Sequence, residues 1–204
     1  MEAHSTINHS KPEVFSDAEI WQRLKKSDSQ ALKLIYHQHI KILYLYGGRF
    51  SKDKGVIEDC IQELFMTLWE RRFIIGNTDA IRPYLLTSLR RRMIRVTSKN
   101  HIRIDRNFEI EKYDFNIEFS SEEKLINSED NIEVIKKLSK ELNKLTKKQQ
   151  EVVYLKYHCG LGYEEIADIM TINYQSARNL MHKSLLLLRK QFPQILILLS
   201  LLAQ

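Results

Sequence analysis

The longest regular pattern in the sequence is an apolar stripe that runs from Val56 to Trp69. Its members are separated by alternating steps of one and three residues, which places them on one face of an α-helix. A β-strand would require apolar residues at every second position instead. The segment therefore predicts an amphipathic helix with this buried side: Val56, Ile57, Cys60, Ile61, Leu64, Phe65, Leu68 and Trp69.

Residues that break helices are rare throughout the chain. Only six glycines and three prolines occur among 204 residues, too few for the many turns of an all-β fold. Three pairs have the spacing of a capping box, in which a Ser or Thr and a Glu or Gln three residues later satisfy the first amides of a helix. They predict helix starts after Ser16, Ser27 and Thr146, so we expect an all-α fold.

The predicted helices form two groups, which indicates two helical domains. The first group ends with a helix that Pro83 would open, with Leu85, Leu86, Leu89, Met93 and Val96 on its apolar side. The second group contains a short helix over 163–170, a three-residue turn and a helix over 174–190, which is the pattern of a helix-turn-helix. We expect a flexible N-terminus (1–15), a first domain (16–100), a linker (101–130), a second domain (131–192) and an apolar tail (193–204).

Charge is distributed unevenly along the chain, whose formal net charge is +6. Residues 1–100 hold 17 Lys and Arg against 11 Asp and Glu, and residues 131–204 hold 11 against 6. The stretch between them, 101–130, holds only 4 basic residues against 9 acidic ones. This alternation suggests two domains that face nucleic acid, joined by an acidic linker.

Two motifs resemble those of a known family. The stretch DCIQELFMTLW (59–69) is similar to region 2 of sigma-70-family factors, which direct RNA polymerase to promoters. The stretches LTKKQQEVVYLKY (145–157), GLGYEEIA (160–167) and SARNLMHK (176–183) are similar to region 4. The order of the motifs and the short linker resemble the extracytoplasmic-function (ECF) subgroup, so a two-domain sigma factor is the expectation.

The resemblance implies a polymerase-binding surface and two DNA-binding surfaces. The helix predicted over 56–69 would dock on the β′ clamp of core RNA polymerase, and the loop and helix after it would read the −10 element. There, Phe73 or Tyr84 would stack on an unpaired base, unless it belongs to the core.

Asn173 would cap the helix that reads the −35 element. The implied residues are Asp59, Gln62, Glu63, Leu64 and Phe65 for polymerase; Asn77, Thr78, Asp79, Arg90, Arg91 and Arg95 for −10; and Gln175, Ser176, Arg178, Asn179, His182 and Lys183 for −35.

The resemblance also implies partners. They are core RNA polymerase, through its β′ clamp and β flap, promoter DNA, and an anti-sigma factor that would cover the same surfaces. The acidic linker would either mimic nucleic acid inside polymerase or act as a solvated tether. The apolar tail would pack on region 4 or dock a partner. A cytoplasmic location is expected, without a small-molecule substrate and without a membrane-embedded segment.

An enzyme is not expected from this sequence. His37 and His39 lie two residues apart and so would not share a helix face, and His158 and Cys159 lack a second ligand pair for zinc. Phosphate-binding and nucleophile motifs are also missing, so no cofactor and no metal are expected. Two alternatives remain: a stand-alone helix-turn-helix regulator that binds DNA without polymerase, and a sigma-like interaction module whose DNA-binding surfaces are idle.

Overall fold

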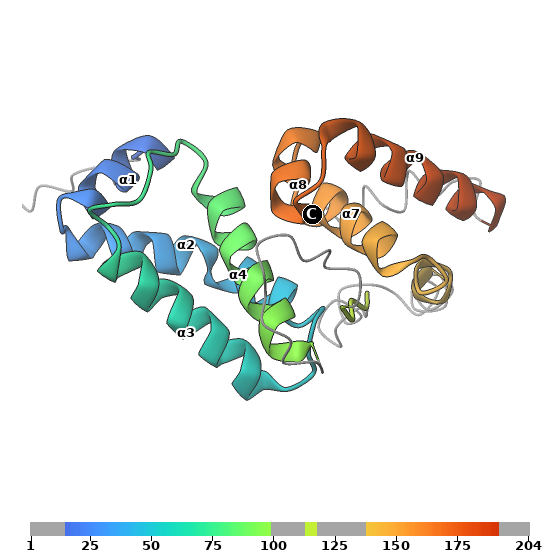
Figure 1. The fold of residues 1–204 in the computed structure, drawn as a ribbon, viewed down its shortest axis with the longest axis horizontal. Helices are drawn as coiled ribbons and strands as arrows, with labels where there is room; N and C mark the ends of the chain where they lie inside the picture. The colour runs from blue at the N-terminus through green and yellow to red at the C-terminus, as the bar shows by residue number, and fades with distance from the viewer. Residues whose placement is uncertain (1–14, 99–112, 118–137, 192–204) are drawn as a thin grey trace, which may run out of the picture.

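The computed structural model describes residues 15–98, 113–117 and 138–191, and every regular element within these ranges is an α-helix (Figure 1). The all-α prediction is confirmed. Residues 138–142 are also helical. The helices are α1 (Asp17–Lys25), α2 (Ser29–Gly47), α3 (Lys54–Glu70), α4 (Ile81–Thr97), α7 (Lys147–Tyr157), α8 (Tyr163–Met170) and α9 (Tyr174–Gln191).

In the first helical group, α1, α3 and α4 all pack against α2. The predicted stripe of α3 faces this core, where Ile57, Leu64 and Leu68 are almost completely buried. On α4, however, Val96 is 53% exposed and Ile94 is buried instead. The expectation for Val96 was therefore wrong. Near the end of α4 the buried residues are Met93 and Ile94, so the buried face of the helix does not include Val96.

Two of the three predicted capping boxes are present. Ser16 and Glu19 cap α1 reciprocally, and Thr146 and Gln149 do the same for α7. The box predicted at Ser27 was wrong, because Ser27 has a positive φ of 65° and lies in the turn before the helix. The next residue, Asp28, caps α2 by accepting a hydrogen bond from the backbone N–H of Gln30.

The helices α7, α8 and α9 form a second packed group, in which α8 and α9 make the predicted helix-turn-helix. The turn between them begins at Thr171, which has the left-handed conformation with φ 57°. Asn173 then accepts a hydrogen bond from the backbone N–H of Ser176 at 2.7 Å, which confirms its predicted role as the cap of α9.

The two helical groups are in direct contact. Helix α8 packs against α4, and the guanidinium of Arg82 donates to the carbonyl of Cys159 at 3.3 Å. Residues 113–117 belong to the predicted linker, yet Tyr113, Phe115 and Ile117 are buried. The part of the expected linker that the structure describes is therefore partly buried. It supplies apolar side chains to the junction of the two groups.

Both cysteines, Cys60 and Cys159, are free and buried. No helix within the described ranges combines the length and apolar character needed to cross a membrane. The apolar tail predicted to pack on the second domain, residues 193–204, lies outside the described residues, as do most of the acidic residues of 101–130.

Candidate polymerase and DNA interfaces

The polar face of α3 presents an exposed row of acidic and amide side chains. Asp59, Gln62 and Glu63 are all exposed, as expected for a docking surface. Leu64 and Phe65 were predicted to contact the same partner, but they are only 2% and 8% exposed. They belong to the core in this structure, where they position the helix that carries the acidic row.

Glu63 is tied to the neighbouring helix α4. Arg92 donates to the Glu63 carboxylate at 2.9 Å and to the hydroxyl of Thr67 at 2.6 Å. The Glu63 side chain remains 66% exposed, so the ion pair adds little stability by itself. Its geometric effect is to fix the direction in which the Glu63 carboxylate points. Asp59, one turn earlier, has no ion pair among the described residues.

Apolar side chains accompany this acidic row, and sequence patterns did not indicate them. Met66 on α3 is 54% exposed, and Tyr36 on α2 is 42% exposed. The Tyr36 ring packs edge-on against Phe65 at a centroid distance of 5.1 Å. Aromatic residues and methionine are enriched at protein–protein contacts relative to the rest of a protein surface.

The loop between α3 and α4 is held in place by α1. The indole N–H of Trp21 donates to the carbonyl of Gly76 at 2.8 Å. The side-chain oxygen of Asn77 accepts hydrogen bonds from Gln22 at 3.1 Å and from Lys25 at 2.7 Å. Asn77 was predicted to contact a base, and its amide oxygen is occupied by α1 in this structure.

The other two predicted loop residues differ in their surroundings. The hydroxyl of Thr78 accepts from the N–H of Ala80 at 3.1 Å and stays partly buried, so it shapes the loop. Asp79 is exposed. The nearby carboxylate of Asp17 accepts from the N–H of Ile81 at 2.8 Å and supports the start of α4, whose Ala80 cap has no capping side chain.

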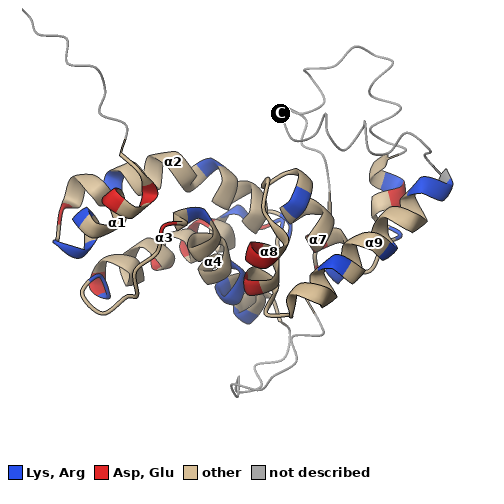
Figure 2. Ribbon diagram, turned by 90° about the horizontal axis from the view of Figure 1, so that it is seen from above, with Lys and Arg blue, Asp and Glu red and all other residues tan. Residues whose placement is uncertain are grey.

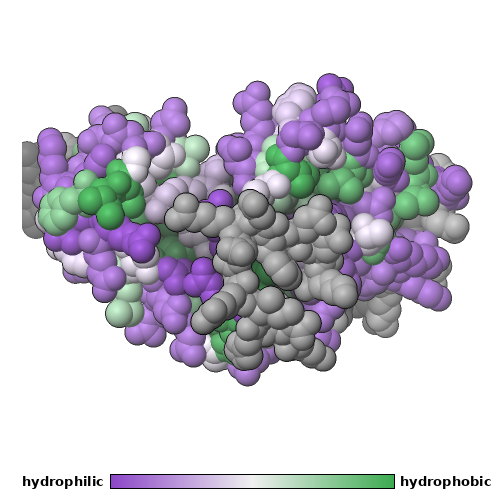
Figure 3. Space-filling model, viewed as in Figure 1, coloured by the Kyte–Doolittle hydropathy of each residue, from purple (hydrophilic) through white to green (hydrophobic). Residues whose placement is uncertain are grey.

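The two candidates for base stacking, Phe73 and Tyr84, have different surroundings. Tyr84 packs edge-on against Trp21 at 4.9 Å and is partly buried, so it belongs to the edge of the core. Phe73 is 64% exposed and Ile74 is 79% exposed. The guanidinium of Arg72 lies 4.2 Å from the centre of the Phe73 ring. Figure 3 shows hydrophobic surface at the end of the molecule that holds this loop.

The arginines of α4 divide into exposed and buried groups. Arg91 and Arg95 are exposed, and the ribbon in Figure 2 marks the basic positions of this helix in blue. Arg90, which was predicted to face DNA with them, is only 2% exposed. That expectation does not hold in this conformation, because the Arg90 side chain points across the junction toward α7.

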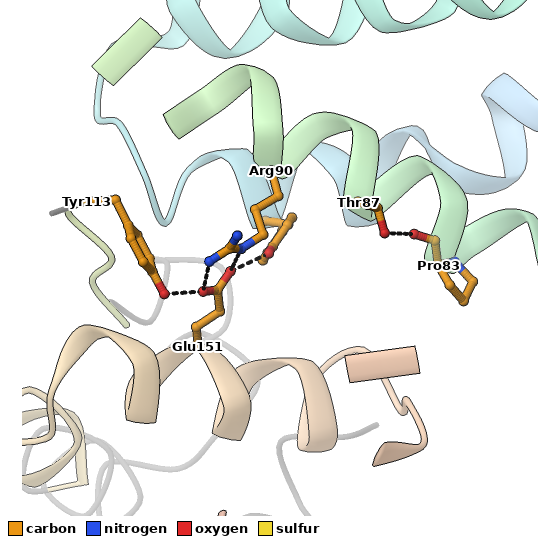
Figure 4. Close-up of polar contacts among 6 residues, drawn as sticks. Pro83, Thr87, Arg90, Tyr113 and Glu151 are labelled. Carbon is orange, nitrogen blue, oxygen red and sulfur yellow. Dashed lines mark hydrogen bonds and ion pairs between the residues drawn. The ribbon is translucent and has the colours of Figure 1, made fainter. Parts of the chain in front are cut away.

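Arg90 pairs with Glu151, which is completely buried (Figure 4). Its Nε lies 2.8 Å from Oε1 of Glu151, and its Nη2 lies 3.1 Å from Oε2. The hydroxyl of Tyr46 donates to Oε1 at 2.6 Å, and the hydroxyl of Tyr113 donates to Oε2. One carboxylate from the second group thus receives hydrogen bonds from α4, from α2 and from residues 113–117.

This cluster changes the proton affinities of its members. Burial alone would lower the pKa of Arg90, but the adjacent Glu151 carboxylate raises it above its ordinary value. The pKa values of Tyr46 and Tyr113 are raised, first by burial and then by the charge of Glu151. Arg90 therefore stays charged and both phenols stay protonated near neutral pH.

The exposed side of α9 carries most of the residues predicted to read DNA. Gln175, Arg178, Asn179, His182 and Lys183 are all exposed. Ser176 is partly buried, and its backbone N–H is bound to the Asn173 cap. Figure 2 shows the basic residues of α9.

Two contacts organise the first turns of α9. The amide nitrogen of Gln175 donates to the side-chain oxygen of Asn179 at 3.2 Å. The guanidinium of Arg178 lies 5.8 Å from the centre of the Tyr174 ring. Tyr174 is 45% exposed, and no sequence pattern marks it as a candidate contact. Within the described ranges, no three His, Cys, Asp or Glu side chains are grouped so that they could hold a metal ion.

Comparisons with known proteins agree with this geometry. The family description "Sigma-70 region 2" matches residues 35–102, and "Sigma-70, region 4" matches residues 135–188, together more than half of the chain. Among solved structures, the chain is similar to CnrH in complex with the cytosolic domain of CnrY, with a TM-score of 0.58 and 14% sequence identity. That match covers 87% of this chain and 97% of CnrH and shows a shared fold. A comparison with curated proteins finds no match.

Proposed function

The chain belongs to the sigma-70 family, and from this premise we propose how its surfaces divide the work of promoter-directed transcription. It carries regions 2 and 4 in the arrangement of the ECF subgroup, and the sigma-70 family is not an enzyme family. The observation that carries the proposal is that the acidic row of α3 and the polar side of α9 are exposed in one chain, each inside the matching family region.

The acidic row of α3 is the proposed contact for core RNA polymerase. In the sigma family this face meets the basic coiled coil of the β′ clamp, so Asp59, Gln62 and Glu63 would supply complementary charge. Such complementarity speeds association and fixes the register of the two surfaces. The exposed Met66 and Tyr36 beside the row would supply apolar contact area.

The loop between α3 and α4 is the proposed reader of the −10 element. Exposed Phe73 offers a ring on which an unpaired base could stack, and Asp79 offers polar atoms for a base edge. Asn77 would first have to release the hydrogen bonds that its oxygen accepts from Gln22 and Lys25. Arg91 and Arg95 would contact the phosphate backbone.

Helix α9 is the proposed reader of the −35 element. Arg178 suits guanine, while Asn179 and Gln175 suit adenine, because each can form a bidentate hydrogen-bonded pair in the major groove. Lys183 would contact phosphate and add affinity without sequence preference. Ser176 and His182 lie on the same turns and complete the proposed surface.

We further propose an anti-sigma partner and a cytoplasmic location. The support for the partner is the similar fold of CnrH, whose structure was determined in complex with the cytosolic domain of CnrY. A protein that covers the acidic row of α3 or the α9 surface would keep this chain from polymerase. The location follows from the proposed role, since core polymerase works in the cytoplasm.

In vitro transcription tests the proposal directly. Purified chain and core polymerase, incubated with a pool of genomic promoter fragments, should yield transcripts whose mapped start sites share −10 and −35 elements. A stand-alone regulator would bind specific duplex DNA without polymerase and yield no new start sites. A sigma-like interaction module would capture polymerase but would likewise support no promoter-dependent transcription.

A further inference from the structure

The junction between the two helical groups conceals part of the proposed DNA-binding surface. Arg90 belongs to the helix that carries Arg91 and Arg95, yet its guanidinium is buried against Glu151. Helix α8, which supports the DNA-reading helix α9, packs against the same helix α4. In this conformation, region 4 therefore covers one side of the α4 helix.

In this closed arrangement, the two proposed DNA-reading surfaces are also too close together to reach both promoter elements. The names of the −10 and −35 elements place their centres about 25 base pairs apart, or about 85 Å of B-form DNA at 3.4 Å per base pair. Among the described helices the longest is α2, which has 19 residues and so spans about 28 Å. Two bodies of this size in direct contact hold their DNA-reading surfaces much closer than 85 Å. The chain between α4 and residue 138 has enough residues to bridge that distance when extended.

We propose that Glu151 is an internal competitor for DNA phosphate and that its contacts with Arg90, Tyr46 and Tyr113 form an autoinhibitory latch. A carboxylate that accepts two parallel N–H bonds from a guanidinium uses the geometry in which arginine binds a phosphate. When region 4 moves away, Glu151 leaves and Arg90 joins Arg91 and Arg95 on an uncovered α4. This inference rests on the proposed function for the identity of the DNA-binding surface.

The chemistry of the cluster suits a contact that must open. A buried ion pair adds little net stability, because the cost of removing both charges from water offsets most of their attraction. Nη1 of Arg90 is buried and has no hydrogen-bond partner among the described residues, so within these residues one donor of this arginine is unsatisfied. Removing a single partner, in contrast, leaves an uncompensated buried charge, so replacing the Glu151 carboxylate with a neutral side chain opens the latch.

Residues 113–117 couple the latch to the chain that joins the two regions. Tyr113 donates to Glu151, and Phe115 packs edge-on against Phe50 at 5.1 Å and against Tyr154 at 5.9 Å. Any interaction that draws this segment out of the junction removes a hydrogen bond from Glu151 and a ring from the aromatic cluster at the same time. Opening the latch and releasing the segment are therefore one event.

The test compares the full chain with Glu151→Gln, using Glu164→Gln as a control. Glu164 is an exposed carboxylate of α8, so its replacement makes the same change in charge without touching the latch. Small-angle scattering measures the radius of gyration, and fluorescence anisotropy measures affinity for a labelled single-stranded DNA of random sequence. Glu151→Gln should enlarge the radius of gyration and raise the DNA affinity by about tenfold or more, whereas Glu164→Gln should do neither.

Two further variants make the test decisive. Arg90→Gln leaves the Glu151 carboxylate as the uncompensated buried charge, so it should open the chain as Glu151→Gln does but should gain much less DNA affinity, because the arginine itself is missing. Tyr113→Phe keeps the ring and removes one hydrogen bond, so it should open the chain partially. This variant decides the matter if circular dichroism shows that Glu151→Gln does not fold.

An unchanged radius of gyration in a folded Glu151→Gln, or an equal gain in affinity for Glu164→Gln, overturns the proposal. Binding of the unmodified chain to core polymerase is measured separately, so a failure of the sigma function is distinguishable from a failure of the latch.

Discussion

The indole N–H of Trp21 donates to the backbone carbonyl of Gly76, 55 residues later, at 2.8 Å. Trp21 is itself completely buried, so this hydrogen bond ties the loop between α3 and α4 to the centre of the first helical group. The same loop carries Asn77, Asp79 and the exposed Phe73. Helix α1 therefore helps to position the loop proposed to contact the −10 element. The conformation of this loop does not depend on contacts within the loop alone.

Replacing Trp21 with Phe should loosen this loop. The ring still fills much of the core, but the carbonyl of Gly76 loses its donor, so we expect stability to fall by about 1–3 kcal/mol. Urea denaturation measures the loss, and hydrogen exchange should show faster exchange in residues 73–80 than in α2. Tyr84→Phe, which keeps its ring against Trp21, is the control and should leave the loop protected. Equal protection of the loop in both variants would show that the hydrogen bond does not hold it.

Reversing the charge of Asp59 should weaken binding to core polymerase. Asp59 is exposed and takes part in no ion pair among the described residues, so Asp59→Lys changes the surface without disturbing a neighbour. We expect the Kd for core polymerase to rise by about tenfold or more, with a slower association rate. Biolayer interferometry with immobilised polymerase provides both values.

The control for this prediction is Glu164→Lys, which reverses an exposed charge on α8. Its Kd should remain within about twofold of the unmodified chain. Glu63→Lys should act in the same direction as Asp59→Lys but also release Arg92 from α3. If Asp59→Lys binds as tightly as the control, the acidic row of α3 is not the docking surface.

Removing Arg178 should damage promoter choice and leave polymerase binding intact. A bidentate contact with a base contributes about 1–3 kcal/mol of discrimination, so Arg178→Ala should reduce transcription from promoters with an intact −35 element by about tenfold. Asn179→Ala should give a similar loss, with preference relaxed at a different base pair. Lys183→Ala, in comparison, should weaken all promoters alike and reduce the salt dependence of binding. Transcription from a library randomised at −35 measures these effects, and unchanged base preferences for Arg178→Ala would contradict the assignment of α9.

His39 should make the protein less stable in mild acid. It is 5% exposed, and neither ring nitrogen has a hydrogen-bond partner in the part of the chain that the structure describes. Burial lowers its pKa below 6.5, with a smaller opposing effect from Asp17 and a further lowering by Arg82. The unfolded chain therefore binds this proton at a higher pH than the folded chain. Stability from this group is complete above about pH 6.5 and falls as the pH drops through that value toward the lower folded pKa.

The measurement is urea denaturation between about pH 7.5 and about pH 5.5, where an unperturbed histidine titrates. His39→Leu should flatten the decline in this window, because the buried imidazole is gone. His37→Leu replaces an exposed histidine of the same helix and should retain the decline. The same slope in both variants would assign the decline to other groups.

Local signals predicted most of the helices, because those signals depend on neighbours in sequence. The capping boxes at Ser16 and Thr146, the stripe of α3 and the cap at Asn173 all involve residues within a few turns of one another. The error at Ser27 shows the limit of such patterns. Asp28 competes for the same role one residue later, and only the backbone conformation decides between them.

The junction could not be predicted in the same way. Arg90 and Glu151 are separated by 61 residues, and each looks like an ordinary surface charge when its own helix is considered alone. Tyr113 and Phe115 lie in a stretch without helical periodicity, so nothing local marks them as core residues. Leu64 and Phe65 are a smaller case: the motif placed them at the polymerase contact, whereas their helical phase already placed them in the apolar stripe.

The burial of both thiols has a practical consequence for spectroscopy. Burial raises the pKa of Cys159 to about 12 and also raises the pKa of Cys60, so neither sulfur is an accessible thiolate at neutral pH. A cysteine introduced on the surface of α1 and another on α9 should therefore react with maleimide dyes while the native pair stays unmodified. Fluorescence energy transfer between such dyes can follow the spacing of the two helical groups in an otherwise unaltered chain.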